Sequence, residues 1–189
     1  MTTKQVLENV AVFLGKEELL DCAYFTNTNE EIPEDIQKDL NLMLRCLNFI
    51  VNEIATDYLP VLKQKSVMFV DNCLDIKEVD TNIYKIIKIE NKNGEVVKFN
   101  YTNGCIKSKV TEAIITYSSF PEKADLNGEV ENFNNMMTDR VLAYGTAMEY
   151  SFVNSLYDDA TVWESRYKNA LLVLSQKKHN LIMPKRRWL

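Results

Sequence analysis

The chain contains 189 residues, a length that suits one globular domain of about 100–200 residues and that can bury a core without disulfide or metal staples. Hydrophobic residues make up 46% of the sequence and charged residues 26%, which is ordinary for a soluble globular protein. There is no run of about 18 apolar residues and no basic-then-apolar leader. We therefore expect neither a membrane-spanning helix nor a secretion signal.

The net charge of −5 is distributed unevenly along the chain. Residues 1–60 contain 4 basic and 11 acidic residues, a net of −7, whereas residues 61–125 (10 and 9) and 126–189 (8 and 7) each carry +1. Five basic residues lie between Lys177 and Arg187, a stretch without an acidic residue. An acidic front and a basic end are typical of a protein that meets copies of itself or a charged partner.

The four cysteines stand far apart in the sequence. Separated by 24, 27 and 32 residues, they are Cys22, Cys46, Cys73 and Cys105. Zinc sites are usually built from close pairs of ligands, so this spacing argues against a zinc site. We expect four free thiols in a reducing compartment.

The first 60 residues are predicted to be helical. Thr2 opens the first helix, Gln5 completes a capping box, and Gly15 ends the helix. A short helical piece is expected over residues 16–24. After a polar loop, apolar residues repeat with a 3.6-residue period, which predicts a long helix over Pro33–Asp57.

The periodicity changes to that of β-strands over residues 61–120. The Asn-Gly pairs at 93–94 and 103–104 are hairpin-turn signals. We predict a small antiparallel sheet of four or five strands inserted between two helical halves, with positive φ at both turn glycines. A polar linker is expected over residues 121–135.

The remaining fold is predicted to be organised around two antiparallel helices, Thr138–Leu156 and Asp158–Lys178, with Asp158 as the cap of the second. Small residues recur at every fourth position of the first helix and share one face: Ala143, Ala147, Ser151 and Ser155. A bulkier ridge lies beside them: Met137, Val141, Tyr144, Met148 and Phe152. Gly145 permits close backbone approach, so we expect the hairpin to pack on the Pro33–Asp57 helix.

Together these elements predict an α+β protein. It is mainly a helical bundle, made of N-terminal helices and the C-terminal helix hairpin, with an inserted small antiparallel β-sheet and an extended C-terminal tail. The prediction gives a single domain over residues 1–178, comprising a helical part (1–60), the inserted sheet (61–120) and the linker with the hairpin (121–178). Residues 179–189 form the interaction tail.

Few residues have the chemistry of a catalytic site. His179 is the single histidine and lies in a basic segment, so triads that use histidine and most zinc sites are hard to build. The five glycines are scattered, and no phosphate-binding loop is formed. We expect no catalytic, cofactor-binding or metal-binding residue.

Three groups of residues carry chemistry that a site could use. Four clustered acids lack the spacing and central glycine of a calcium loop: Asp71, Asp75, Glu78 and Asp80. Arg140 and Glu149 are interpreted as a buried structural pair. Four aromatics at helical spacing are interpreted as core: Tyr144, Phe152, Trp163 and Tyr167. An enzyme with a site built from the acids or Glu149 is the alternative, and metal binding that depends on Asp75 would favour it.

The C-terminal tail combines aromatic and apolar residues with cations. Its apolar residues, among them Trp188 and Leu189, stand beside three cations at positions 185–187. An aromatic anchor next to basic residues is a common composition of interaction segments. Two alternatives are that Trp188 folds back onto its own domain, and that the cations bind nucleic acid, although the acidic chain argues against a dedicated DNA binder.

The order of elements, the hairpin sequence AYGTAMEYSFVNSLYDDATVWESRYKNAL and the tail PKRRWL resemble the head–tail connector, or adaptor, proteins of tailed bacteriophages. These include relatives of the tail tubular proteins of short-tailed phages. The most distinctive part is the run from Tyr157 to Tyr167, which also contains Ala160, Trp163 and Arg166.

The resemblance implies a virion structural protein that is not an enzyme and binds no cofactor. It implies a homo-oligomeric ring, usually twelve-fold, that joins the capsid portal protein to the tail or to a second ring protein. Genomic DNA is expected to pass through the channel without sequence-specific binding, and no membrane is involved. The implied location is the head–tail interface of the virion, and the host cytoplasm during assembly. The residues implied in portal binding are Met183, Pro184, Lys185, Arg186, Arg187, Trp188 and Leu189.

Overall fold

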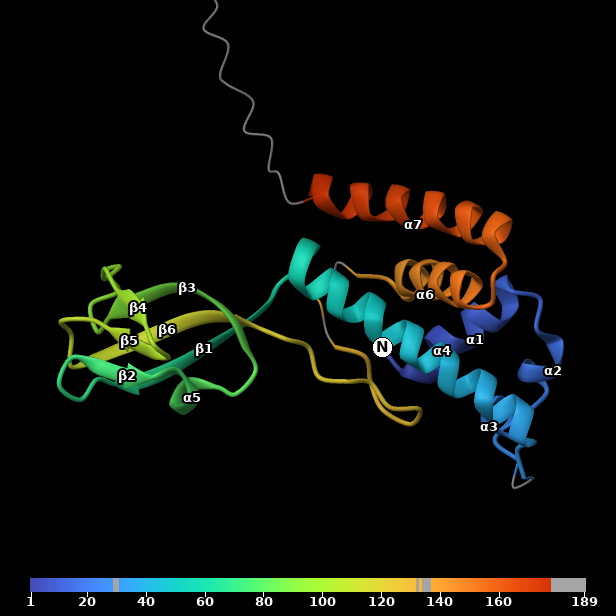
Figure 1. The fold of residues 1–189 in the computed structure, drawn as a ribbon, viewed down its shortest axis with the longest axis horizontal. Helices are drawn as coiled ribbons and strands as arrows, with labels where there is room; N and C mark the ends of the chain where they lie inside the picture. The colour runs from blue at the N-terminus through green and yellow to red at the C-terminus, as the bar shows by residue number, and fades with distance from the viewer. Residues whose placement is uncertain (29–30, 132, 134–136, 178–189) are drawn as a thin grey trace, which may run out of the picture. The chain divides into compact units, whose positions relative to one another are not determined.

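The computed structural model describes residues 1–28, 31–131, 133 and 137–177. The chain is an α+β protein whose contacts group into two compact units (Figure 1). The helical unit comprises Met1–Ile50 and the chain from Lys123 onward, and the β unit comprises Val51–Glu122. The β unit is therefore an insertion between two segments of the helical unit, as the sequence predicted for its strands.

The helical unit begins with helix α1 (Thr3–Phe13), and its predicted capping box is confirmed. The Gln5 backbone N–H donates to Thr2 Oγ1, and the Thr2 backbone N–H donates to Gln5 Oε1, both at 3.3 Å. The short helical piece expected over 16–24 is divided into α2 (Glu17–Leu20) and α3 (Ala23–Thr26). The chain is extended at Cys22 between them, which prevents one continuous helix.

Helix α4 (Glu34–Glu53) is the predicted long helix, and the π-helical segment η1 (Ile54–Tyr58) continues it to the predicted end. Glu34 and Asp35 lie in its first turn, where the helix dipole favours negative charge. Its apolar stripe is buried in the helical unit: Leu40, Met43, Cys46, Leu47 and Ile50. The 3.6-residue period therefore identified both the helix and its core-facing side.

The C-terminal helices α6 (Asp139–Val153) and α7 (Tyr157–Lys177) lie side by side and run in opposite directions (Figure 1). Ser155, in the short connection, has a positive φ of 61°. The expected cap at Asp158 is wrong, because α7 already begins at Tyr157 and Asp158 lies within its first turn. The predicted last residue of this helix, Lys178, is outside the described part of the chain.

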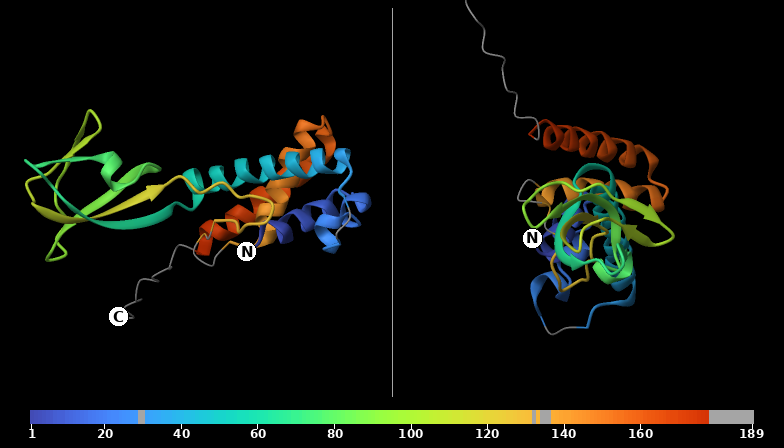
Figure 2. Two further views of the ribbon diagram at one scale, coloured as in Figure 1. Left: turned by 90° about the horizontal axis from the view of Figure 1, so that it is seen from below. Right: turned by 90° about the vertical axis from the view of Figure 1, so that its left-hand side faces the viewer.

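Three helices approach one another closely at Gly145 of α6. A Cβ atom there would lie 2.8 Å from Ile50 Cγ2 of α4 and 3.0 Å from Tyr167 Cε2 of α7. Figure 2 shows α4 alongside α6 within this unit. The predicted packing of the hairpin on the long helix is therefore present at this point, and only glycine fits without displacing a neighbour.

The two predicted ridges of α6 are mostly buried, and each ends in an exposed residue. Ala143, Ala147 and Ser151 of the small ridge are fully buried, while Ser155 lies in the connection. The prediction that Phe152 is a core residue is wrong, because its side chain is 40% exposed. It lies in the last turn of α6, beyond the point where the ridge is covered.

The β unit contains two three-stranded antiparallel sheets instead of the single sheet that was predicted. The larger has the order β1 (Val61–Met68), β6 (Glu112–Ser119), β3 (Ile83–Asn91). The smaller has the order β2 (Cys73–Asp75), β5 (Cys105–Lys107), β4 (Asn100–Thr102), and the short helix α5 (Ile76–Val79) follows β2. The turn glycines Gly94 and Gly104 have φ of 80° and 79°, as predicted.

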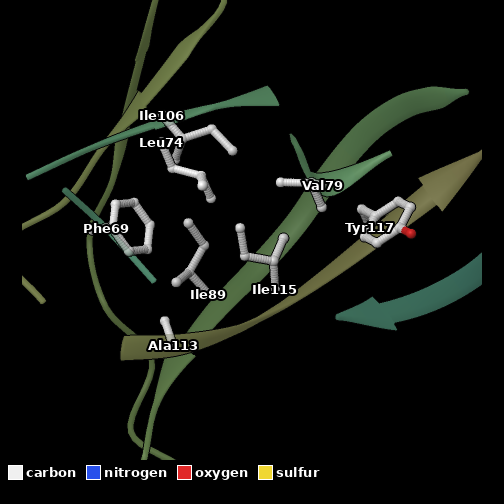
Figure 3. Packing of buried hydrophobic residues seen from close by; sticks show 8 residues of the cluster. All are labelled: Phe69, Leu74, Val79, Ile89, Ile106, Ala113, Ile115 and Tyr117. Atoms are coloured by element: carbon white, nitrogen blue, oxygen red, sulfur yellow. The ribbon is translucent and has the colours of Figure 1, made fainter. Parts of the chain in front are cut away.

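The core of the β unit lies between its two sheets. Figure 3 shows Leu74 and Ile106, from the smaller sheet, pointing toward Phe69, Ile89 and Ile115. Strands as short as β2, β4 and β5 cannot support an isolated sheet in water, so we infer that burial against the larger sheet holds them in place. A strand of three residues is too short to show a clear alternation of apolar and polar positions. This explains why the sequence suggested a single sheet.

Lysines lie along both outer strands of the larger sheet. Strand β1 carries Lys63 and Lys65, and β3 carries Lys85 and Lys88. Lys65 Nζ donates to the carbonyl oxygens of Glu78 and Val79 at 2.8 Å each, which places a cation at the C-terminal end of α5. The central strand β6 pairs with both of these outer strands.

A disulfide joins Cys73 and Cys105, with their Cα atoms 6.1 Å apart. The expectation of four free thiols is therefore wrong for this pair. Antiparallel pairing of β2 with β5 brings together residues that are 32 positions apart, a proximity that sequence spacing alone does not show. The other two cysteines, Cys22 and Cys46, are free and buried, and burial raises the pKa of the Cys46 thiol to about 11.

Replacing Ala147 by leucine tests the packing of α6. The residue is fully buried, so added methylene groups must displace neighbours and should lower the stability by about 1–3 kcal/mol. Thermal unfolding measures the change. Val153→Leu on the same helix is the control, because Val153 is exposed and its replacement should change the stability by less than about 0.5 kcal/mol. Equal midpoints for the two variants would contradict the observed packing.

Replacing Cys73 by serine tests the disulfide. Opening a loop of 32 residues should destabilise the β unit by about 3–4 kcal/mol in the chain-entropy description. Urea unfolding of the wild type, with and without dithiothreitol, should show the same loss, whereas the reductant should not affect Cys73→Ser. A wild type that is insensitive to the reductant would show that the bond is not formed.

Candidate functional site

The residues predicted to bind the portal lie outside the described part of the chain. They are Met183, Pro184, Lys185, Arg186, Arg187, Trp188 and Leu189, and the single histidine, His179, belongs to the same stretch. Their assignment stays a prediction.

Two members of the acidic cluster, Asp75 and Asp80, form hydrogen bonds that stabilise the local fold. Asp71 adopts a positive φ of 50° beside Asn72. Asp75 caps α5, because its side chain accepts the Lys77 backbone N–H at 2.9 Å. Across residues 1–28, 31–131, 133 and 137–177, no group of three or more His, Cys, Asp or Glu side chains could hold a metal ion.

Asp80 belongs to a hydrogen-bonded network within the β unit. Its carboxylate accepts the Asn82 backbone N–H at 2.9 Å and the Tyr117 hydroxyl at 3.0 Å. The backbone bond from Asn82, with further contributions from Tyr117 and the lysines of β1, holds the pKa of Asp80 below its ordinary value in spite of burial. Burial, reinforced by Asp80, raises the pKa of Tyr117 to about 12. The pair therefore ties α5 to strand β6.

Arg140 and Glu149 do not form the predicted buried pair. Arg140 is exposed in the first turn of α6, and Glu149 is only partly buried. The two residues are nine positions apart, which places them at different levels of the helix. Trp163 and Tyr167, in contrast, are buried as predicted.

Two adjoining hollows on the helical unit form a candidate binding surface. The acidic hollow has a volume of about 500 Å³ and is lined by Gly15, Lys16, Glu17, Glu18, Leu19, Asp35, Ile36 and Asp39. The aromatic hollow has a volume of about 390 Å³ and is lined by Phe13, Leu14, Gly15, Lys16, Tyr150, Leu156, Asp159, Val162 and Trp163. Gly15 and Lys16 line both, so the hollows meet at the turn after α1.

The geometry of this turn follows from the way α1 ends. Gly15 adopts a positive φ of 64°, and the Lys16 backbone N–H returns to the Ala11 carbonyl at 3.0 Å. Glycine is the residue best suited to this left-handed position. The turn leaves Lys16 between the two hollows, where its ammonium group forms an ion pair with Asp39.

Tyr150 completes a three-residue network beneath Lys16. The Tyr150 hydroxyl donates to Asp39 Oδ1 at 3.0 Å, and Lys16 Nζ lies 5.0 Å from the centre of the Tyr150 ring. Burial lowers the pKa of Lys16, but its interactions with Asp39 and Tyr150 outweigh burial, so the pKa lies above its ordinary value. Burial also raises the pKa of Tyr150, only partly offset by Lys16. The network links the turn after α1 with α4 and α6 at this surface.

An aromatic stack forms one wall of the aromatic hollow. Phe13 lies 5.2 Å from both Tyr144 and Trp163, measured between ring centroids, and the last two are 5.9 Å apart. The guanidinium of Arg166 lies 4.7 Å from the centre of the Trp163 ring. These contacts pack the rings against one another, so stacked aromatic side chains form this wall.

The rims of the two hollows differ in chemistry. Glu17, Glu18 and Asp35 are exposed around the acidic hollow, and no cation of the described residues forms an ion pair with them. Leu156 and Val162 are exposed at the aromatic hollow. Sequence reasoning missed this surface, although the acids and aromatics were visible, because it combines residues from the two ends of the chain.

No protein-family model and no curated protein matches this chain. Within the part of the chain that the structure covers, none of the helices combines the length and the apolar character needed to span a membrane.

Replacing Tyr150 by phenylalanine tests the network under the hollows. Loss of the hydroxyl removes one hydrogen bond to a partly exposed carboxylate, so we expect a loss of about 1 kcal/mol near pH 7. The pKa of Tyr150 is raised in the folded chain, so its hydroxyl contributes fully below pH 10, and this contribution declines as the pH rises through the folded-state pKa.

Chemical denaturation of the wild type and Tyr150→Phe at several pH values provides the measurement. The difference in unfolding free energy should be constant between about pH 6 and 9 and should shrink above pH 10. A difference that grows above pH 10 would mean that Tyr150 ionises more easily in the folded chain.

Proposed function

We propose that this chain is a structural subunit of a tailed-bacteriophage virion, and that copies of it form a ring joining the capsid portal to the tail. It acts through protein contacts and carries out no chemical reaction. The proposal rests on the resemblance of its hairpin and tail to connector proteins and on the exposed apolar surface described next.

An apolar corner at the junction of α6 and α7 is the observation that carries the proposal. It consists of Phe152, Val153, Leu156 and Tyr157, which are between 40% and 62% exposed. The Phe152 and Tyr157 rings have their centroids 6.5 Å apart, so the exposed groups adjoin one another. Contiguous exposed apolar side chains are typical of protein interaction sites, because water is excluded when a partner covers them.

Such a corner suits ring assembly. In a cyclic oligomer of more than two copies, one surface of each subunit meets a different surface of the next. We propose that the apolar corner contacts the neighbouring copy, and that the acidic N-terminal part supports the approach of basic surfaces. Twelve copies is the number that the resemblance implies.

The tail is proposed to reach the portal. In this arrangement Trp188 is the buried anchor, and Lys185, Arg186 and Arg187 pair with acidic residues of the portal protein. An aromatic anchor flanked by cations gains both buried area and charge pairing when the partner is present.

Electron microscopy of the purified chain tests the ring, alone and with the portal protein encoded in the same genome. The wild type should form closed rings, and Val153→Asp should abolish them, because a charge in the apolar corner would be buried at the contact. Val173→Asp is the matched control, since Val173 is similarly exposed but lies in the C-terminal half of α7. Rings formed equally by both variants, or no assembly of the wild type, would contradict the proposal.

Binding kinetics with the portal protein test the tail. Trp188→Ala should raise the dissociation rate, at a cost of about 2 kcal/mol or more of binding free energy. Lys185→Ala should mainly lower the association rate.

Deletion of residues 183–189 should give heads that package DNA but do not join tails. Normal joining by the truncated chain would refute this role, and strongly salt-dependent binding of a short DNA duplex would instead favour a nucleic-acid-associated protein.

A further inference from the structure

We propose that the two hollows of the helical unit are a docking site for the C-terminal segment of the same chain, residues 178–189. In this contact Trp188 occupies the aromatic hollow, and Lys185, Arg186 and Arg187 lie over the acidic hollow. The inference concerns the isolated chain and does not depend on the ring or on the portal.

The chemistry of the hollows matches that of the segment. Glu17, Glu18 and Asp35 give the acidic hollow an excess of negative charge, since its Lys16 is already paired with Asp39. The segment carries several cations and no acidic residue. Opposite charges on two surfaces favour their encounter and fix their orientation.

The order of residues in the segment also matches the arrangement of the hollows. Three consecutive cations directly precede Trp188 in the sequence. The acidic and aromatic hollows share Gly15 and Lys16, so they directly adjoin. A short peptide can therefore place its cations over one hollow and its indole in the other. The indole would cover Leu156 and Val162, which are otherwise exposed to water.

The segment is long enough to reach this surface on its own chain. Val162, beside the aromatic hollow, precedes Lys177 by fifteen residues of α7, which corresponds to about 22 Å along the helix. Trp188 follows Lys177 by eleven residues, which can span up to about 36–40 Å when extended. Because a tether of this length gives an effective concentration in the millimolar range, contact within one chain is favoured over contact between chains in dilute solution.

Quenching of tryptophan fluorescence by acrylamide in the full chain provides the test. Trp163 and Trp188 are the two tryptophans, and Trp163 is buried in the aromatic stack. The variant Trp188→Phe supplies the signal of Trp163, and its subtraction from the wild type leaves the signal of Trp188. We expect Trp188 to be protected from quenching, to emit at a shorter wavelength than a tryptophan in water, and to behave identically at 1 µM and at about a hundredfold higher concentration.

Two valines of α7 form a matched pair for locating the contact. Val162 and Val173 are 51% and 53% exposed and lie eleven residues, about three turns, apart on one face. Val162→Asp should raise the quenching constant of Trp188 several-fold, whereas Val173→Asp should leave it unchanged. The double variant Glu17→Gln, Glu18→Gln should also raise it, and this variant serves if Val162→Asp does not fold.

Each other outcome overturns the inference. Full quenching of Trp188 in the wild type would show that the segment does not dock. Protection that survives both Val162→Asp and the double variant would place the contact elsewhere, as would equal loss in Val162→Asp and Val173→Asp. Protection that increases with protein concentration would show that the segment binds a second copy instead.

Discussion

The helical unit depends on the close approach of α4, α6 and α7 at Gly145. A single added carbon would lie within 2.8–3.0 Å of Ile50 and Tyr167, so the separation of these helices is set by the absence of a side chain. The fully buried Ala143 and Ala147 extend the same close contact along α6. The position of Tyr150 follows from this packing, and with it the bond to Asp39 that supports the surface at Lys16.

The parts of the fold that sequence reasoning identified are those governed by local physics. The capping box of Thr2 and Gln5 and the positive φ of Gly94 and Gly104 need only a few neighbouring residues. The 3.6-residue period of apolar residues, sustained along α4, also identified the buried side of this helix. The second sheet and the Cys73–Cys105 disulfide were missed, because both depend on pairing between segments about 30 residues apart, which no local pattern encodes.

For the candidate surface, too, local sequence patterns predicted some features and not others. Trp163 and Tyr167 were recognised as buried from their helical spacing, whereas Phe152 was not recognised as exposed, because periodicity does not show where a covering neighbour ends. The meeting of Gly15 and Lys16 with Tyr150, Leu156 and Val162 could not be predicted, since it requires the first and last helices to be placed together. The tail was conspicuous from composition alone, and its binding role remains a prediction.

The lysines on both outer strands of the larger sheet have a consequence for solubility. An open sheet edge offers unpaired backbone groups that can template addition of a strand from another molecule, and charged side chains on edge strands discourage such addition. In this chain β1 presents Lys63 and Lys65, and β3 presents Lys85 and Lys88, whereas the mostly buried strand β6 lies between them. At high local concentration, uncontrolled fibril-like growth through the sheet is thereby disfavoured. Association then occurs through side-chain surfaces, which can form closed assemblies with a defined number of copies.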